Sequence, residues 1–315
     1  MIDSFNREIS YMRLSVTDLC NLRCRYCMPE EGVCKKSHHL MLTEDEMIQA
    51  VEVAAGLGIK KLRITGGEPL VKPNILSICE RAAQVEGIDK LCLTTNGTML
   101  PKLGKDLKSA GVQNLNISLD TLNQDKYRYI TRIGDINDAL AGIHTALELG
   151  FGKVKVNAVL IGGFNDDEIV DFAELTRKYP VDVRFIELMP FVQYDESSLG
   201  HYISGSTVLE KLPDAEPVEG HGVAREFRLL GAQGNIGLID SISNRFCSSC
   251  NRIRLTADGK LKPCLHSNQE FTIKGLSPEE MRKVMIETIL AKPECHTVAA
   301  ATHSNAGRNM NEIGG

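Results

Sequence analysis

The sequence lacks the features that mark several large classes of protein. Its 315 residues contain no apolar run approaching the roughly 18 residues of a membrane-spanning helix. Residues 1 to 12 are polar and mixed, so no secretory signal peptide is expected. No internal repeat, low-complexity segment or Gly-x-x-x-x-Gly-Lys-Ser/Thr phosphate loop occurs. A formal net charge of -5 argues against broad nucleic-acid or anionic-membrane binding. We therefore expect a cytoplasmic globular protein, long enough for about two domains.

The ten cysteines are the richest source of chemistry in the chain. Without an export signal, they are expected to be metal ligands or reduced core residues rather than disulfides. Cys79 and Cys92 lie in apolar patterns that predict small core residues, and Cys34 is predicted to be an exposed thiol. Cys295 is left without an assignment. The other six fall into two sets of three.

Strand-like apolar runs alternate with helical patterns over the first two thirds of the chain. Thr43 and Glu46 predict a capping box at one helix start, and Pro101 and Gly111 bracket another helix. Repeated strand-helix units indicate parallel strands with right-handed crossovers, in a barrel or a doubly wound sheet. Six units fall short of the eight in a closed barrel. The predicted strands are residues 11–16, 61–65, 90–94, 114–118, 153–160 and 182–187.

The alternation ends near residue 215. Pro213, Pro217, Gly220 and Gly222 lie at this change and predict a domain boundary. We therefore expect an α/β domain over residues 1–215 and a smaller domain over residues 216–315.

The first cysteine set is Cys20, Cys24 and Cys27, directly after the first predicted strand. Three thiolates cannot close a four-iron cube, which needs one on each iron, so one iron would stay open for chemistry. A zinc ribbon instead uses two Cys-x-x-Cys pairs and closes its site. Taken alone, the spacing also permits a structural zinc site or a chance arrangement.

Cys20, Cys24 and the pair Tyr26-Cys27 together resemble the signature of the radical S-adenosylmethionine (SAM) enzymes. The resemblance implies an open, incomplete (β/α)6 TIM-like barrel. It also implies a 4Fe-4S cluster whose open iron is chelated by SAM. An electron from the cluster then releases a 5'-deoxyadenosyl radical, and the protein supplies position and exclusion of water.

The carboxyl ends of parallel strands carry the site in such folds, so site residues are expected there. After the second predicted strand, Gly66 and Gly67 let a ligand approach the backbone and Glu68 can accept from an ammonium group, although a plain tight turn is an alternative. By resemblance, the SAM-binding residues are Tyr26, Gly67, Ser118 and Met189, and Thr94 lies beside the substrate. A helix cap, a turn or a core methionine would explain the last three equally well.

The second cysteine set is Cys247, Cys250 and Cys264. A zinc site completed by His266 is one reading of this spacing. A second 4Fe-4S cluster with one open iron is favoured because the chain already contains a radical SAM triplet. We therefore expect two 4Fe-4S clusters in the protein.

The segment from Phe246 to Gly259, followed by Cys264-Leu265, closely resembles the second-cluster segment of the GTP 3',8-cyclases of molybdenum cofactor biosynthesis. The residues Tyr11 to Asp18 and the ending Arg308 to Gly315 also match this family. The resemblance implies cyclisation of GTP to (8S)-3',8-cyclo-7,8-dihydroguanosine 5'-triphosphate, started by removal of the C3' hydrogen. It implies an external electron donor and, as product acceptor, a downstream cyclic pyranopterin monophosphate synthase. A homodimer is left open.

The absence of a phosphate loop means that side chains must hold the GTP phosphates. Arg13, Arg63 and Lys155 lie on or just inside predicted strands, an expensive place for charges without a partner. A surface salt bridge, or a stem lying along apolar surface, is the alternative for each. By resemblance, the GTP-binding residues are Arg13, Arg63, Thr94, Lys155, Arg252, Ile253 and Arg254. The open iron of the second cluster would position the guanine.

The last two residues, Gly314 and Gly315, are similar to a C-terminal Gly-Gly that reaches into the family's active site. A disordered end is the alternative. Two rival functions also stay open at this point: a peptide-modifying radical SAM maturase with auxiliary clusters, which needs a peptide groove, and a non-enzymatic zinc-binding scaffold.

Overall fold

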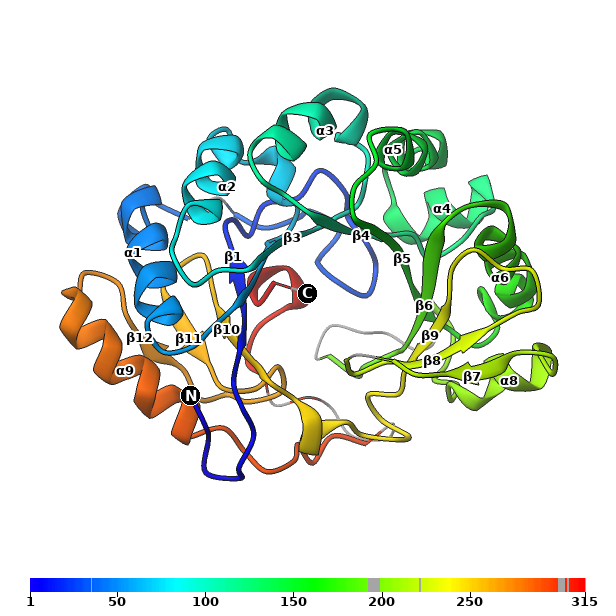
Figure 1. The fold of residues 1–315 in the computed structure, drawn as a ribbon. Helices are drawn as coiled ribbons and strands as arrows, with labels where there is room; N and C mark the ends of the chain where they lie inside the picture. Colours follow the sequence, from blue (N-terminus) through cyan, green and yellow to red (C-terminus); the bar gives the residue numbers. More distant parts are fainter. Residues whose placement is uncertain (35, 192–198, 221, 300–303, 305, 315) are drawn as a thin grey trace.

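The computed structural model describes residues 1–34, 36–191, 199–220, 222–299, 304 and 306–314. Within these residues, twelve strands form one sheet that curves into an open barrel (Figure 1). The strand order is β12-β11-β10-β1-β2-β3-β4-β5-β6-β9-β8-β7. All neighbours from β10 to β9 pair in parallel, and the pairs at both outer edges are antiparallel. The predicted α/β fold, an incomplete TIM-like barrel, is confirmed.

All six predicted strands are present, and their ends differ from the prediction by at most one residue. They are β1 (Tyr11–Ser15), β2 (Lys61–Thr65), β3 (Lys90–Thr95), β4 (Asn114–Ser118), β5 (Lys153–Leu160) and β6 (Val181–Glu187). The later strands are β7 (Glu216–Val218), β8 (Arg225–Arg228), β9 (Ile236–Ile239), β10 (Arg252–Leu255), β11 (Lys260–Lys262) and β12 (Phe271–Thr272).

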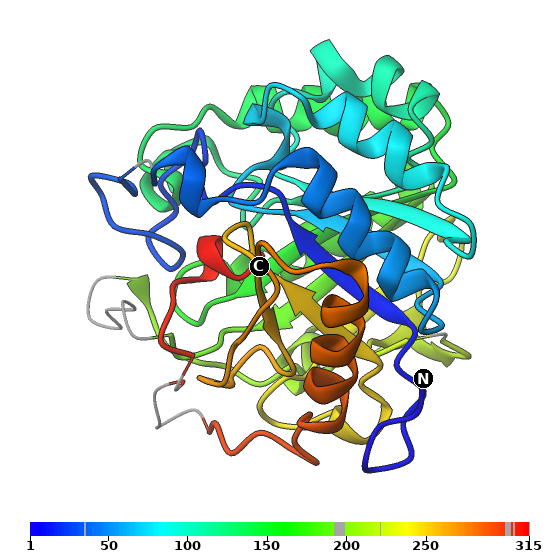
Figure 2. The same cartoon turned by 90° about the vertical axis from the view of Figure 1, so that its left-hand side faces the viewer.

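The helices cover the convex side of this sheet (Figures 1 and 2). The capping box at Thr43 is confirmed, because Thr43 Oγ1 accepts from the Glu46 amide and the Glu46 carboxylate accepts from the Thr43 amide. Pro101 lies in the first turn of its helix. The helices are α1 (Glu44–Ala55), α2 (Ile75–Ala83), α3 (Leu100–Ser109), α4 (Gln124–Thr131), α5 (Ile136–Glu148), α6 (Ile169–Lys178), α8 (Ser206–Lys211) and α9 (Pro278–Leu290), with short 3-10 turns at His38–Leu40, Pro69–Val71, Asp166–Glu168, Cys247–Ser249 and Met310–Glu312.

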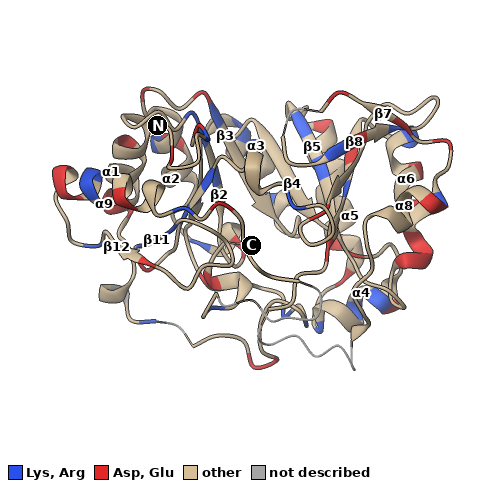
Figure 3. Ribbon diagram, turned by 90° about the horizontal axis from the view of Figure 1, so that it is seen from below, with Lys and Arg blue, Asp and Glu red and all other residues tan. Residues whose placement is uncertain are grey.

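Side-chain alternation divides the sheet into an apolar face and a polar face. On β1, Met12 and Leu14 are fully buried in the hydrophobic core. Tyr11 and Arg13 point to the opposite face, because successive side chains on a strand alternate. Since the helices cover the convex side, the polar face lines the concave interior. Figure 3 shows Lys and Arg on strands at both sides of this interior.

The strands from the last hundred residues lie at both edges of the sheet. β10 pairs in parallel with β1, and β9 pairs in parallel with β6. Residues 216–315 therefore extend the predicted six-stranded unit on both sides. The division into domains at residue 215 stays a prediction. Among the described residues, no helix is long and apolar enough to cross a membrane.

The C-terminal segment returns to the concave side of the sheet. Its last 3-10 turn, Met310–Glu312, lies inside the curve of the barrel in both views (Figures 1 and 2). Ile313 and Asn311 are each 1% exposed, so this segment packs as part of the interior.

Candidate active site

The first cysteine set lies on the loop that follows β1. Hydrogen bonds from the loop to the end of α4 hold it in place: the Arg23 amide donates to the Thr131 carbonyl at 3.0 Å and the Arg25 amide to the Ile130 carbonyl at 2.9 Å. Arg132, with a φ of 65°, donates from its guanidinium to the Arg23 carbonyl at 2.7 Å. A left-handed backbone at a non-glycine residue is costly, and such residues gather at functional sites.

Gly67 packs against the backbone that leads into Cys20. Its amide donates to the Thr17 carbonyl at 2.7 Å, and the next amide, of Glu68, donates to the Leu19 carbonyl at 2.8 Å. A Cβ atom on Gly67 would lie 2.4 Å from the Leu19 carbonyl oxygen. Glycine is therefore required here for the contact between this turn and the cysteine loop.

Glu68 is buried and links the turn after β2 to the end of β3. It is 1% exposed, and its carboxylate accepts from the Asn96 amide at 2.7 Å, the Thr95 hydroxyl at 2.8 Å and the Leu70 amide at 3.0 Å. Burial raises the pKa of Glu68 to about 7. Three protein donors occupy part of the acceptor capacity of this carboxylate, and Oε2 accepts from the Asn96 amide alone. That Glu68 also accepts from a ligand's ammonium group stays a prediction.

Tyr26 and Ser118 lie at the same carboxyl edge of the sheet. The Tyr26 hydroxyl donates to the Asp120 carboxylate at 2.7 Å, and the other oxygen of Asp120 accepts from the Val159 amide at 2.8 Å. Burial raises the pKa of Asp120 to about 6. Asp120 follows the end of β4, two residues after Ser118, so it ties the cysteine loop to β4 and β5.

The thiols of the first set are stabilised as neutral groups in this structure. Burial raises the pKa of Cys20 to about 11, that of Cys27 to about 12 and that of Cys24 well above its usual value. Asp120 adds to the increase at Cys24 and Cys27. Because metal binding needs the thiolate, a cation bound here would have to displace these protons.

Basic side chains line the concave interior in layers set by strand register. Arg13 on β1 is opposite Arg63 on β2 and Arg254 on β10. Tyr11 in the next layer is opposite Lys61 and Arg252. Arg63 and Arg254 are only 5% and 6% exposed. The sheet therefore gathers cations from three neighbouring strands into one buried region.

Burial and mutual repulsion destabilise the charged forms of several of these cations. Burial and the neighbouring Arg252 lower the pKa of Arg254 to about 10, and burial and Arg254 lower that of Arg13 well below its usual value. Burial alone would raise the pKa of Tyr11, but Arg63 and Arg13, with other cations beyond them, lower it to about 7. An anion bound in this interior would relieve the repulsion.

Arg63 and Thr94 are brought together by adjacent strands. The Arg63 Nε donates to the Tyr11 hydroxyl at 2.7 Å, and Nη1 donates to the Leu93 carbonyl at 3.0 Å and approaches the Thr94 hydroxyl at 3.4 Å. The fixed guanidinium faces the barrel interior instead of solvent. The surface-salt-bridge alternative for Arg63 is wrong.

The opposite wall of the interior carries paired cations. Lys155 on β5 donates to Asp182 on β6 at 2.8 Å, and Arg184 on β6 lies 3.3 Å from Glu226 on β8. Lys155 and Asp182 are each 13% exposed at the side chain. Lys155 thus has a salt bridge, as the alternative reading proposed, but it lies on the inner face rather than at the surface.

Lys61 and Arg184 were missed by the sequence reasoning. The strand alternation contained the signal: Lys61 is two residues before Arg63, and Arg184 alternates with the buried Val183 and Phe185. Conversely, Ile253 was named with Arg252 and Arg254, yet its side chain is 1% exposed and belongs to the hydrophobic core. The structure therefore does not bring the Ile253 side chain into the interior.

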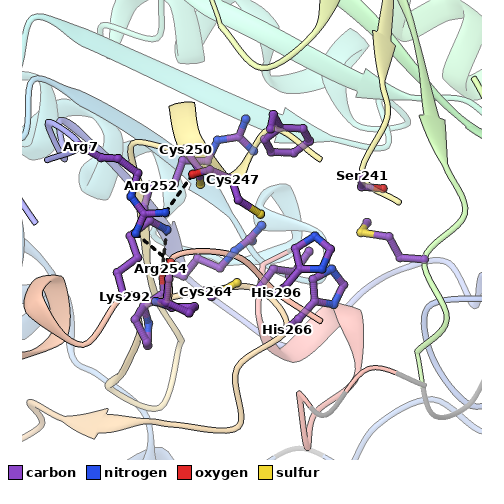
Figure 4. A pocket seen from close by; sticks show the side chains of 15 residues that line it. Arg7, Ser241, Cys247, Cys250, Arg252, Arg254, Cys264, His266, Lys292 and His296 are labelled. Carbon is purple, nitrogen blue, oxygen red and sulfur yellow. Dashed lines mark hydrogen bonds between the residues drawn. The ribbon is translucent and has the colours of Figure 1, made fainter. Parts of the chain in front are cut away.

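The second cysteine set lines a pocket (Figure 4). Arg7, Arg252, Arg254 and Lys292 lie in the same wall, and no acidic residue is among the described residues that line it. Figure 4 shows Cys247, Cys250 and Cys264 grouped with these cations on one side, and His266 and His296 beside them. The lining residues are Arg7, Met189, Ser241, Phe246, Cys247, Cys250, Arg252, Arg254, Pro263, Cys264, Leu265, His266, Lys292, Pro293 and His296.

Two of the basic residues join the cysteine segments through backbone carbonyls. Lys292 is 3% exposed and donates to the Arg252 and Pro263 carbonyls, each at 3.0 Å. Arg7 donates to the Cys247 carbonyl at 2.9 Å. Burial alone would raise the pKa of Cys250, but the positive charges of Lys292 and Arg252 lower it.

The surroundings of His266 favour its neutral imidazole. Its Nδ1 lies 2.9 Å from the Ser304 hydroxyl, its ring stacks on Phe191, and burial beside His296 lowers its pKa to about 3. Among the described residues, no three His, Cys, Asp or Glu side chains converge closely enough to hold one metal ion. Thiolates that bind different irons of a cube need not converge on one point.

The C-terminal tail lies between the two cysteine sites. Gly314 has a φ of +69°, and a Cβ there would lie 2.3 Å from the Thr65 hydroxyl, so only glycine fits. Its carbonyl accepts from Arg254 at 2.9 Å. Met189 packs against the small cluster that contains Ile313 of this tail, and it also lines the second pocket. Gly315 lies outside the described residues.

Comparison with known proteins agrees with this geometry. Residues 14–176 match the model of the radical SAM superfamily, and residues 181–298 match a model described as Molybdenum Cofactor Synthesis C. The chain is 48% identical over its full length to the GTP 3',8-cyclases of Alkaliphilus oremlandii and Alkaliphilus metalliredigens, and each comparison covers 100% of both chains. The chain belongs to the GTP 3',8-cyclase family of radical SAM proteins.

Solved structures extend the comparison to the fold. Streptococcus suis SuiB bound to S-adenosylmethionine is similar with a TM-score of 0.67 at 14% identity, over 91% of this chain and 66% of that chain. The maturase HydG is similar with a TM-score of 0.52 at 19% identity, over 64% of this chain and 48% of that chain. At these identities the likeness shows the radical SAM fold alone. Membership of the superfamily implies one 4Fe-4S cluster and SAM.

Proposed function

We propose that this GTP 3',8-cyclase family member converts GTP to (8S)-3',8-cyclo-7,8-dihydroguanosine 5'-triphosphate, the first step of molybdenum cofactor biosynthesis. The observation that carries the proposal is the cationic interior, which lies on the same inner face as the first cysteine loop and the second cysteine pocket. The names of the full-length relatives and the match to the molybdenum cofactor synthesis model support it. A peptide-modifying enzyme would need a groove where these buried cations lie.

The first cysteine site fits a 4Fe-4S cluster with SAM. Cys20, Cys24 and Cys27 are partly buried on one loop, and the Cys27 amide donates to the Cys24 carbonyl at 2.9 Å, which turns the loop tightly. When bound, the reduced cluster and SAM supply a 5'-deoxyadenosyl radical that starts the cyclisation by removing the C3' hydrogen of GTP. Tyr26, Gly67, Ser118 and Met189 are the residues proposed to hold SAM.

The second cysteine site fits a second 4Fe-4S cluster. Cys247, Cys250 and Cys264 line one pocket in which basic side chains would offset the negative charge of three thiolates. With three protein ligands for four irons, one coordination position remains for the guanine. Arg252 leads from this pocket into the interior, so the same strand serves both the cluster and the nucleotide.

The basic residues of the interior are proposed to hold the triphosphate. Arg13, Arg63, Arg252 and Arg254 approach from β1, β2 and β10, and Lys155 approaches from β5 across the interior. Lys61 and Arg184 extend the same lining and join the proposed set. Arginine meets phosphate oxygens with two charge-assisted hydrogen bonds, which fixes the orientation of the nucleotide as well as binding it. Thr94, whose hydroxyl lies 3.4 Å from Arg63 Nη1, is proposed to contact the substrate.

The protein's main catalytic contribution would be orientation and exclusion of water. Gly314 brings the tail against Ser15 and Thr65 at the carboxyl ends of β1 and β2. A radical on the ribose must meet C8 of guanine before it meets solvent, and a substrate held at both ends satisfies that condition. The reaction consumes two electrons and one proton beyond SAM and GTP, and we propose that an external donor supplies the electrons.

The remaining expectations belong to the same proposal. The product would pass to a downstream cyclic pyranopterin monophosphate synthase, and the reaction would take place in the cytoplasm. The proposed functional division assigns residues 1–215 to SAM chemistry and residues 216–315 to the second cluster and the tail. The proposal does not depend on whether the protein forms a homodimer.

Anaerobic incubation of the reconstituted protein with SAM, reductant and GTP tests the proposal. We expect 5'-deoxyadenosine and the cyclised nucleotide in equal amounts, identified by mass spectrometry. Incubation with ATP in place of GTP is the control for guanine selectivity. Formation of 5'-deoxyadenosine with no change in GTP, in protein that holds both clusters, would contradict the proposed reaction.

A further inference from the structure

Ion pairs of Arg308 attach the C-terminal tail, which the structure describes as far as Gly314, to the rest of the protein. Arg308 donates to Glu270 from Nε at 2.6 Å and from Nη2 at 2.8 Å. It also donates from Nη1 to both oxygens of Asp258, at 2.9 and 3.1 Å. The Arg308 side chain is 14% exposed, so water competes weakly for these bonds.

The two carboxylates belong to the ribbon that carries the second cysteine site. Asp258 lies in the turn between β10 and β11, and Glu270 directly precedes β12. The fully buried Lys262 of β11 strengthens the attachment, because it lies 3.2 Å from Glu270 and donates to the Ala306 carbonyl of the chain entering the tail. The start of the tail is thus fixed to β10–β12.

The other end of the tail contacts the first cysteine loop and the core arginines. The Asn311 side-chain amide donates to the Asp18 carbonyl at 3.0 Å, and the Asn311 backbone is hydrogen-bonded to Cys27. Lys36, beyond the cysteine loop, donates to Glu312 at 3.0 Å. The Gly314 and Ile313 carbonyls accept from Arg254 at 2.9 and 3.3 Å. Residues 309–314 therefore connect the first cysteine loop to Arg254 in the wall of the second pocket.

We infer that Arg308, clamped between Asp258 and Glu270, is the positioning residue that seats residues 309–314 between the two cysteine sites. The tail loses its conformational freedom when it docks, and Gly314 has no side chain to offset that loss. Arg308 fixes the first point of the tail, so the carbonyls that orient Arg254 arrive in place. The effect on catalysis rests on the proposed function, whereas the docking itself does not.

Hydrogen exchange on the anaerobically reconstituted full-length protein tests the clamp. In R308Q we expect amides of residues 309–314 to exchange about tenfold faster or more, because a released tail exposes them to water. R308K should restore part of the protection. The matched control is R282Q, at an exposed arginine of α9. Peptides from β1 and α9 should keep their protection in every variant.

Unchanged exchange of the tail in R308Q, or equal acceleration in R282Q, would overturn the inference. If R308Q does not fold, E270Q replaces it, because that variant keeps Arg308 and its pair with Asp258 and removes one carboxylate. Its tail should exchange at an intermediate rate, and a rate equal to that of the parent would also overturn the clamp.

Product analysis of the same variants separates seating from catalysis. In R308Q we expect less cyclised nucleotide per 5'-deoxyadenosine, with the GTP dissociation constant within about threefold of the parent's, since orientation contributes more to rate than to affinity. A loosened tail with a parental product ratio would show that Arg308 does not position the reacting groups. Absence of product from the parent would contradict the proposed function and leave the exchange result intact.

Discussion

The two cysteine sites share one curved sheet, but the charged groups near them differ. Around Cys20, Cys24 and Cys27 the nearest charged partners include the carboxyl groups of Asp120 and Glu68, and the thiols have raised pKa values. Around Cys247, Cys250 and Cys264 the pocket wall is basic; the pKa of Cys250 is lowered, whereas burial raises that of Cys247 to about 11. The same three-cysteine arrangement is therefore built into two electrostatic environments.

This contrast matches the charges of the proposed ligands. SAM carries a sulfonium cation, which nearby carboxyl groups tolerate well. GTP carries several negative charges, and basic residues of the second site continue along β10 into the interior. Because a charge in a buried site must be matched by its surroundings, this difference is the one expected if SAM binds at the first site and GTP beside the second, as proposed.

Substitutions in the two cysteine sets should abolish different activities. Replacing Cys20, Cys24 or Cys27 with Ser should abolish SAM cleavage entirely, because the electron reaches SAM only through this site. The assay is 5'-deoxyadenosine formation by anaerobic protein, with iron content measured in parallel. Substantial cleavage by any of these variants would mean that the sites are not distinct in function.

Replacing Cys247, Cys250 or Cys264 with Ser should abolish cyclisation but leave some uncoupled SAM cleavage. Iron should fall by about four atoms per chain, the content of one cluster. Mass spectrometry of nucleotides and iron analysis together check this outcome. Zinc in place of iron at this set, in protein that is active on GTP, would sink the two-cluster interpretation.

Deleting Gly314 and Gly315 should leave both clusters and SAM binding intact, and most GTP binding, yet strongly reduce cyclisation. The physical reason is that Arg254 loses the carbonyl of Gly314, so the groups between the two sites lose their alignment. The measurement is product formation under saturating GTP. Turnover equal to that of the parent would show that these two glycines do not contribute to catalysis.

Removing a buried cation should weaken GTP without affecting SAM. Separate R13Q, R63Q and K155M variants should each lose about 1.5–3 kcal/mol of GTP binding, if the lost bond is charge-assisted and shielded from water. K153M is the matched control, because Lys153 lies two residues away on the same strand and its side chain is 58% exposed. Calorimetric titration with GTP and with SAM measures both affinities. Equal loss in K153M and K155M would point to general electrostatics.

The smallest expected effect concerns the second site alone. In K292M, loss of a buried positive charge should lower the reduction potential of the second cluster by on the order of 50 mV, with the first unchanged. Potential titration followed by electron paramagnetic resonance resolves the two clusters. Because Lys292 also holds the Arg252 and Pro263 carbonyls, iron content serves as the check that the pocket has kept its shape.

The strands and the cysteine sets could be predicted because their signals are local. The alternation of β5 and β6 and the capping box at Thr43 depend on neighbouring residues, so each was readable in the chain. The pairing of β10 with β1 was not, because it joins Arg252 and Tyr11 across some 240 residues and no local pattern encodes that contact.

The same limit explains what the sequence left open or missed at the site. Arg252 and Arg254 alternate with apolar residues, and only the curvature of the sheet decides that they face an enclosed interior rather than water. The protein donors to Glu68 at Thr95 and Asn96 could not be foreseen, because they lie on a different strand and loop. Lys61 and Arg184 were overlooked because neither belongs to a motif, although their strand phase was visible.

The position of β9 and β10 at opposite edges of the sheet has a consequence for synthesis. Until residues 236–255 have emerged, β1 and β6 are open edge strands of a parallel sheet, with unpaired backbone groups that invite pairing with other chains. The most vulnerable species is therefore the nascent chain that has completed the first six strands. This intermediate becomes stable only when β10 pairs with β1 and β9 pairs with β6, and both pairings join distant parts of the chain. Such long-range pairing is slow, so truncated or destabilised chains would aggregate at this step.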